Sequence, residues 1–179
     1  MILVIRKVNS RAIGANVIVA EDVAANAITT AEIANAAVTP AKLALTNAFD
    51  FTGTLKASGG FLEDYVAATL SGSTLVLNCA TSNNFYYTLG SNITSVSVTG
   101  APANNTAFYF TLKVIQPASG TLYSINWPNS GSNIFKWAGG TSSAPTITST
   151  NGAHDLFGFY THDQGANIYS FKLGQDLKT

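Results

Sequence analysis

The sequence predicts a mainly β protein in which a trimeric stalk of short helix-turn repeats precedes a jelly-roll-like β-sandwich. Two observations carry this prediction. An aliphatic residue recurs at every fifth position between residues 8 and 43, and after residue 48 short alternating runs are separated by clusters of Gly, Asn, Ser and Pro. No long helical periodicity appears after residue 60. We therefore expect an attachment segment at residues 1–7, a stalk at residues 8–47 and a β head at residues 48–179.

The five-residue period of the stalk does not fit one uninterrupted helix or strand. A step of five residues turns an α-helix by about 500°, which leaves successive side chains roughly 140° apart, and an odd step alternates the faces of a strand. A unit of ten residues, made of one capped helical turn and a return, explains the spacing. The aliphatic series consists of Val8, Ile13, Ile18, Val23, Ile28, Ile33, Val38 and Leu43.

Capping signals support this unit. Thr29 is placed as an N-cap and Glu32 completes a capping box, while Ile28 and Ile33 occupy the two positions of a hydrophobic staple. Thr39 repeats the cap ten residues later. Such short turns are unstable alone because helix nucleation is costly, so the aliphatic row needs neighbouring chains. We expect a homotrimer; the alternative is a helical segment packed on its own head domain.

Two decads carry a resemblance to a known family. Residues 27–34 read Ala-Ile-Thr-Thr-Ala-Glu-Ile-Ala, and residues 37–44 read Ala-Val-Thr-Pro-Ala-Lys-Leu-Ala. They resemble the stalk repeats of fibre proteins of tailed bacteriophages, a family that includes head fibres with stems of three supercoiled chains. The resemblance implies a virion protein with a trimeric stem.

The C-terminal third carries a second resemblance, to the terminal β domain of fibre and other structural proteins of phages. It implies a virion component without indicating which one. The segments that carry it are Trp127-Pro128, Trp137 to Thr141, Ala144 to Thr146, Asp155, Phe159 to Thr161, Gly165, Tyr169 to Phe171 and Gly174 to Asp176.

The composition excludes several classes of partner. Charged residues make up only 10% of the chain, the formal net charge is zero and no run of Lys or Arg occurs, which argues against a nucleic-acid partner. No stretch reaches the ~18 apolar residues that a membrane-spanning helix needs. The single cysteine, Cys79, allows no internal disulfide, and its alternation with Leu75 and Leu77 predicts a buried position.

The first five residues, Met1, Ile2, Leu3, Val4 and Ile5, are apolar and precede the basic pair at positions 6 and 7. This order is the reverse of a secretory signal peptide. A short apolar segment of this kind can add to a partner's sheet or dock in a groove. Because no sizeable domain precedes the stalk, we expect this segment to attach the protein to a phage capsid or another virion protein.

The head is expected to contain short strands separated by turn signals, a pattern typical of a sandwich or barrel. Val96 and Val98 are expected to point inward along one of them. The expected strands lie near residues 65–70, 74–79, 84–89, 93–99, 107–115, 122–127, 134–137, 145–150, 154–161 and 167–173.

Catalytic or metal-binding chemistry has little support in the sequence. Two His-Asp pairs start at His154 and His162, and a hairpin that brought them together would offer metal ligands. The favoured alternative places Asp163 in a turn and the histidines at polar strand positions. No carboxylate pair is spaced for glycoside hydrolysis and no nucleophile elbow occurs. We therefore expect no catalytic residue, no metal and no cofactor.

Aromatic residues are the remaining candidates for recognition. Trp127 and Trp137 flank loops rich in Gly, Pro and Asn, so they are the first candidates for contact with a host surface polysaccharide. The alternative is that the aromatic side chains fill the sandwich core or a subunit interface.

Together these patterns favour a non-enzymatic, homotrimeric protein on the virion surface, a capsid fibre or decoration protein. The second hypothesis is a tail fibre that recognises host surface glycans. A polysaccharide-degrading spike ranks third.

Overall fold

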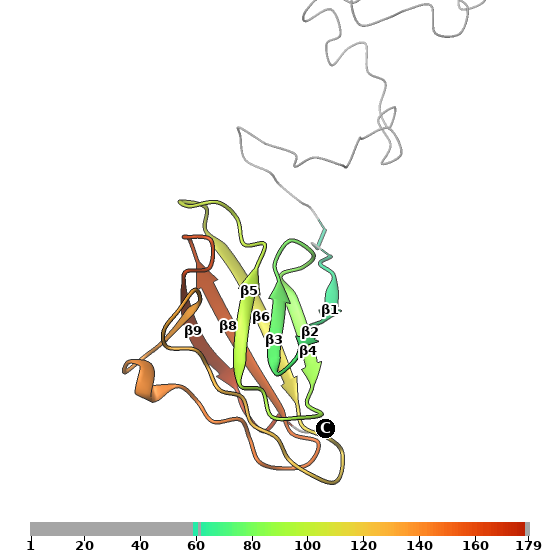
Figure 1. Ribbon diagram of the computed structural model, residues 1–179. Helices are drawn as coiled ribbons and strands as arrows, with labels where there is room; N and C mark the ends of the chain where they lie inside the picture. Colours follow the sequence, from blue (N-terminus) through green and yellow to red (C-terminus); the bar gives the residue numbers. More distant parts are fainter. Residues whose placement is uncertain (1–58, 61, 178–179) are drawn as a thin grey trace, which may run out of the picture. The chain divides into compact units, whose positions relative to one another are not determined.

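The computed structural model describes residues 59–60 and 62–177 (Figure 1). The chain divides into two units between Lys56 and Ala57, and the described residues belong to the second. The predicted attachment segment at residues 1–7 and the predicted stalk at residues 8–47 lie outside the described residues, so both stay predictions. The same holds for residues 48–58 at the start of the predicted head.

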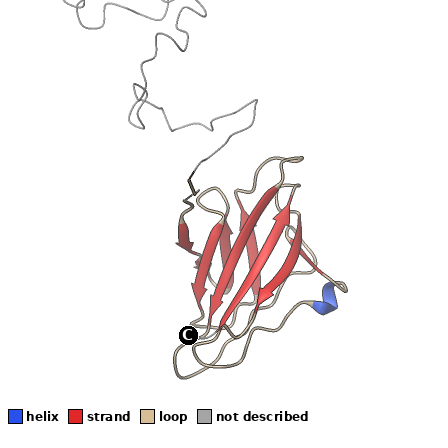
Figure 2. Ribbon diagram, turned by 180° about the vertical axis from the view of Figure 1, so that it is seen from behind, coloured by secondary structure: helices blue, strands red, loops and turns tan. Residues whose placement is uncertain are grey.

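The described residues are mainly β, as the sequence predicts. Nine strands form two sheets that share one core, and Figures 1 and 2 view these layers from opposite sides. The strands are β1 (Tyr65–Ala67), β2 (Thr69–Ser71), β3 (Thr74–Asn78), β4 (Asn84–Thr88), β5 (Ser95–Thr99), β6 (Phe108–Ile115), β7 (Ile134–Trp137), β8 (His154–Thr161) and β9 (Asn167–Gly174). A 3₁₀ turn, η3, covers Thr141–Ser143.

Both sheets are mixed. The larger one has the order β1-β4-β6-β8-β9-β7, and the smaller one has the order β2-β3-β5. The pairs β1/β4, β4/β6, β7/β9 and β3/β5 are parallel. A jelly roll belongs to the antiparallel architectures. The predicted jelly-roll-like pairing is therefore wrong for the described strands, although the prediction of short β-strands is confirmed.

The core lies between the sheets and follows strand alternation. The smaller sheet contributes Leu75, Leu77, Val96 and Val98, which are all buried, as predicted. Cys79 is also buried, as predicted. The larger sheet faces them with phenylalanines and aliphatic residues, and its buried residues include Phe85, Phe110, Leu112, Phe135, Phe157, Phe159 and Ile168.

Two predicted strands, at residues 122–127 and 145–150, are not strands. Residues 122–127 form one isolated backbone bridge, between Ile125 and Ile93, and both segments bond to buried polar side chains of the larger sheet and its margin. Gln116 donates to the carbonyls of Tyr123 and Thr148, at 2.7 and 3.0 Å, and accepts from the amide of Tyr123. Asp155 accepts from the amide and the hydroxyl of Thr148, at 2.7 and 2.8 Å. Side-chain hydrogen bonds thus satisfy several of the backbone groups that a longer ladder would pair.

The predicted strand at residues 65–70 is divided. Its first half, β1, pairs with β4 of the larger sheet, and its second half, β2, pairs with β3 of the smaller one. Ala68 lies between them, is buried, and donates its amide to the carbonyl of Tyr86 at 2.8 Å. The chain therefore crosses from one sheet to the other at a single buried residue.

Candidate functional site

The outer face of the larger sheet is covered by large apolar side chains. Tyr109 is 67% exposed, Phe171 is 55% exposed and Leu173 is 57% exposed. These residues alternate with inward ones along β6 and β9, so all three point away from the core. We call this surface the aromatic face and define it by Tyr65, Tyr86, Tyr109, Tyr160, Tyr169, Phe171 and Leu173.

Cross-strand contacts join the rings of this face. Tyr109 and Tyr160 are directly opposite in the register of β6 and β8, with ring centroids 4.9 Å apart. Tyr160 lies opposite Tyr169 of β9, at 5.9 Å. At the far edge of the sheet, Tyr65 and Tyr86 are 4.7 Å apart. Aromatic pairs at such distances stabilise a sheet modestly and present a wide, rigid apolar surface.

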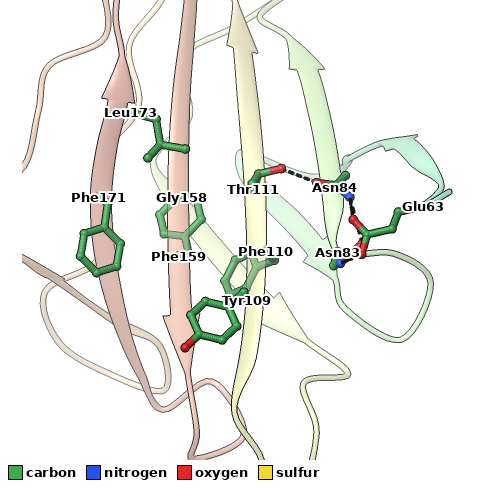
Figure 3. A pocket seen from close by; sticks show the side chains of 10 residues that line it. All are labelled: Glu63, Asn83, Asn84, Tyr109, Phe110, Thr111, Gly158, Phe159, Phe171 and Leu173. Carbon is green, nitrogen blue, oxygen red and sulfur yellow. Dashed lines mark hydrogen bonds between the residues drawn. The ribbon is translucent and has the colours of Figure 1, made fainter. Parts of the chain in front are cut away.

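A groove of about 400 Å³ runs across the aromatic face (Figure 3). Tyr109, Phe171 and Leu173 line one part of it, and Glu63, Asn83 and Asn84 line another. Thr111 of β6 and Gly158 of β8, which are paired in the sheet register, also line it. Because these two neighbours have small side chains, the surface is hollowed between the larger ones.

The polar end of the groove is a connected network. Glu63 accepts hydrogen bonds from the amides of Asn83 and Asn84, each at 2.8 Å, and Asn84 accepts one from the Thr111 hydroxyl at 2.8 Å (Figure 3). The bonds from Asn83 and then Asn84 lower the pKa of the Glu63 carboxyl below its ordinary value of 4.5, against a smaller opposing effect of desolvation. The ionised Glu63 carboxylate is therefore held in the same groove as the apolar side chains of Tyr109, Phe171 and Leu173.

Gly158 keeps the groove open. A Cβ added at this position would come within 3.1 Å of a terminal methyl group of Leu173. Any larger residue would therefore push against Leu173 and fill the hollow between β6 and β9. The backbone of Gly158 needs no left-handed conformation, because it is not among the positive-φ glycines. The groove therefore depends on the absence of a side chain at Gly158 and not on its backbone flexibility.

The outer face of the smaller sheet has a different composition. Thr74, Val76 and Asn78 of β3 and Ser95, Ser97 and Thr99 of β5 alternate with the buried core residues, so Val76 is the one apolar residue among them. Asn133 also covers the free edge of β5, since its side chain accepts from the amide of Val98 at 3.0 Å and donates to the carbonyl of Val98 at 3.2 Å. This face and its edge are therefore polar and partly capped.

The predicted glycan contacts, Trp127 and Trp137, do not lie on an exposed platform. They are 6% and 7% exposed, and their ring centroids are 5.2 Å apart within a cluster of core aromatics. Trp127 also donates its indole N–H to the carbonyl of Pro145 at 3.0 Å. For Trp127 and Trp137 the alternative, in which the aromatic rings fill the core, is confirmed, because both rings pack inward. Trp137 does line a second pocket, of about 440 Å³, together with Ser143, Pro145 and Lys172.

The two His-Asp pairs do not converge. His154 begins β8 and His162 directly follows its last residue, so the length of the strand separates them. Asp155 is buried and bonded to Thr148. Asp163 lies in the turn before β9, as the favoured alternative predicts, and accepts from the Asn167 side chain at 2.6 Å. Among the described residues, no group of three or more His, Cys, Asp or Glu side chains is placed to hold a metal ion.

Comparison with known proteins adds no identification: no family model, curated protein or solved structure matches this chain. In the part of the chain that the structure describes, no helix is long and apolar enough to cross a membrane. The candidate site residues that sequence reasoning missed are those of the groove. The signal was present in the alternation Phe108-Tyr109-Phe110, where an inward phenylalanine on each side places the tyrosine outside.

Proposed function

We propose that this chain is a non-enzymatic structural protein of a phage virion, a homotrimeric capsid-surface fibre or decoration protein. The observation that carries the proposal is the aromatic face. A soluble chain seldom exposes several large apolar side chains together unless they bind another macromolecule. The decad repeats support the trimeric state, and the resemblance of both chain ends to phage proteins supports the location on the virion surface.

The described carboxylates support a structural role. Glu63, Asp155 and Asp163 each accept hydrogen bonds from neighbouring side chains that hold loops and turns in place. In a fibre or decoration protein of this kind, the apolar residues 1–5 dock on the capsid or another virion protein. Many copies then bind by avidity even when each contact is weak.

Light scattering of the full-length chain tests the assembly. The expected mass is that of a trimer of the 18.7 kDa chain. Replacing Ile28 and Ile33 by Asp should dissociate it, because the aliphatic row then buries charge. The matched control places Asp at Thr30 and Asn35, between the aliphatic positions, and should leave a trimer. A monomeric native chain would contradict the proposal.

Immunogold labelling of virions tests the location. Label on the capsid surface is the expected result, and its loss after deletion of residues 1–7 would assign attachment to that segment. Label confined to the tail would favour the second hypothesis.

The second hypothesis, a tail fibre that binds host surface polysaccharide, is favoured by one observation, the groove. Flat apolar walls beside amide and carboxylate groups suit the apolar faces and hydroxyls of a sugar. A glycan array with the native chain and with Tyr109→Ala and Asn84→Ala variants tests it. Binding that both variants abolish would support the second hypothesis, and Thr99→Ala on the opposite sheet is the control.

A further inference from the structure

We infer that the aromatic face is the surface through which the heads of neighbouring copies of this chain associate. This inference rests on the proposed trimer and adds to it a defined interface. Its occupant is a second copy of the same chain, and three observations on the face support that choice.

The first observation is the composition of the face. It presents Tyr, Phe and Leu side chains, whereas its strand residues include few charged groups, among them Lys113 and Lys136. Lys136 is itself directed over the ring of Tyr169, with its ammonium 5.7 Å from the centroid. Enrichment in aromatic residues and depletion of charge mark the buried centre of protein interfaces, and homodimer interfaces are the more apolar class. Among the described residues, the charged groups of the face are confined to these two lysines and to Glu63 at the polar end of the groove.

The second observation is where the chain enters this face. Tyr65, a member of the aromatic face, lies in β1, the first strand that the structure describes after the predicted stalk. Residues 48–64 join the two and reach at most about 60 Å when fully extended. Three heads held by one stalk therefore meet at an effective concentration on the order of millimolar. At such a concentration even a weak apolar contact between heads is populated.

The third observation is the shape of the face. The groove lies between an apolar side, with Phe171 and Leu173, and a polar side, with Glu63, Asn83 and Asn84 (Figure 3). A closed three-fold ring needs two different patches on each copy, because each copy contacts the next one head to tail. The apolar and polar sides of the groove supply such patches, and the groove accepts a side chain that projects from the next copy.

Hydroxyl-radical labelling of the full-length trimer tests the interface. Leu173 lies on the aromatic face and Leu70 lies on β2, the edge strand of the smaller sheet, with 57% and 39% of their surface exposed in the single chain. Each labelling rate is divided by the rate for the same residue in the urea-unfolded chain. We expect Leu173 to react several-fold more slowly than Leu70, together with protection of Tyr109 and Phe171. If Leu173 reacts faster than Leu70 in a chain with trimeric mass, the interface is overturned while the trimer stands.

Two variants, each with one Leu replaced by Glu, provide a second test of the interface. Leu173→Glu should restore the labelling of Tyr109 and Phe171 several-fold, because a carboxylate cannot be buried unpaired at the contact. Leu70→Glu introduces the same charge on the smaller sheet and should leave both rates unchanged. A monomeric mass with a reactive Leu173 overturns both the trimer and the interface. Protection that appears only after bacterial lipopolysaccharide is added identifies a glycan as the occupant and overturns the inference.

Discussion

The two outer faces of this sandwich cover the same core with different surfaces. On the smaller sheet, Leu75, Leu77, Val96 and Val98 alternate mainly with Ser, Thr and Asn. On the larger sheet, the inward phenylalanines alternate with Tyr, Phe and Leu that remain exposed. Strand alternation requires the inward residues but leaves the outward ones free. The polar face shows what the fold alone needs, so the fold alone does not account for the aromatic face.

The largest expected loss of stability follows from a substitution in the core, and it tests whether the two sheets unfold as one unit. Phe157 of β8 is completely buried, and its ring lies 5.1 Å from that of Trp127. Phe157→Ala should lower the free energy of unfolding by about 3–5 kcal/mol, because it removes buried apolar surface and leaves a cavity. Urea unfolding followed by near-UV and far-UV circular dichroism should show one coincident, shifted transition. Two separate transitions would mean that the sheets unfold independently.

A smaller effect is confined to the sheet with the polar face. Gly100 follows β5 with φ at +65°, and an added Cβ would lie 2.7 Å from the Cβ and the amide nitrogen of Ala80. Gly100→Ala should cost about 1–3 kcal/mol through backbone strain and this close approach. Gly90 is the control, because an added Cβ there meets nothing within 4 Å. Equal thermal stability of the two variants would show that the turn at Gly100 adapts freely.

A pH-dependent effect belongs to the sheet with the aromatic face. Burial acts to raise the pKa of Asp163, but hydrogen bonds from Asn167 and Thr161, together with the charge of His162, lower it below 3.8. The carboxylate therefore stabilises the folded state above pH 3.8, and this contribution is lost as the pH falls through the lowered pKa. The stability difference between the native chain and Asp163→Asn should shrink over that acidic range in thermal melts. A stability difference that stays constant with pH would show that ionisation of Asp163 does not contribute to folding stability.

The smallest expected effect concerns the reactivity of the thiol of Cys79, which is buried next to β3 of the smaller sheet. Desolvation raises the pKa of the buried Cys79 thiol to about 12. Since the thiolate is the reactive form, a disulfide reagent at neutral pH should label the native chain very slowly and the unfolded chain fully. The absorbance of the released thiol reports the rate. Fast labelling of the native chain would show that the smaller sheet opens readily.

Much of the head could be predicted from the sequence, because alternation and turn residues are local signals. The β3, β5 and β8 strands lie where the sequence places them, and Leu75, Leu77 and Cys79 point inward as expected. Strand partners were not predictable, since a parallel pair such as β4/β6 leaves no mark in either strand alone. Residues 122–127 and 145–150 looked like strands because Ile125 and Ile147 are core residues there. Nothing in the local sequence reveals that the side chains of Gln116 and Asp155 bond to the backbone of these two segments.

The candidate site was harder to predict than the fold. Trp127 and Trp137 were chosen for their neighbouring loops, but a loop at a strand end can cover an inward side chain as well as expose it. An alanine at either position would test stability more than recognition. The groove depends on Thr111, Gly158 and Asn84 coming together from three strands, and that proximity exists only once the sheet order is known. The predicted stalk lies outside the described residues and awaits the measurements above.

The crossing at Ala68 has a mechanical consequence. Tension applied to the N-terminal side of the head enters at β1, which pairs with β4, and passes within one residue to β2, which pairs with β3. The pairing of β1 with β4 therefore bears the load first, and the buried Ala68 must leave the core before the load reaches β2 and the smaller sheet. Unfolding the head from its N-terminal side therefore requires strand pairs of both sheets to break in succession.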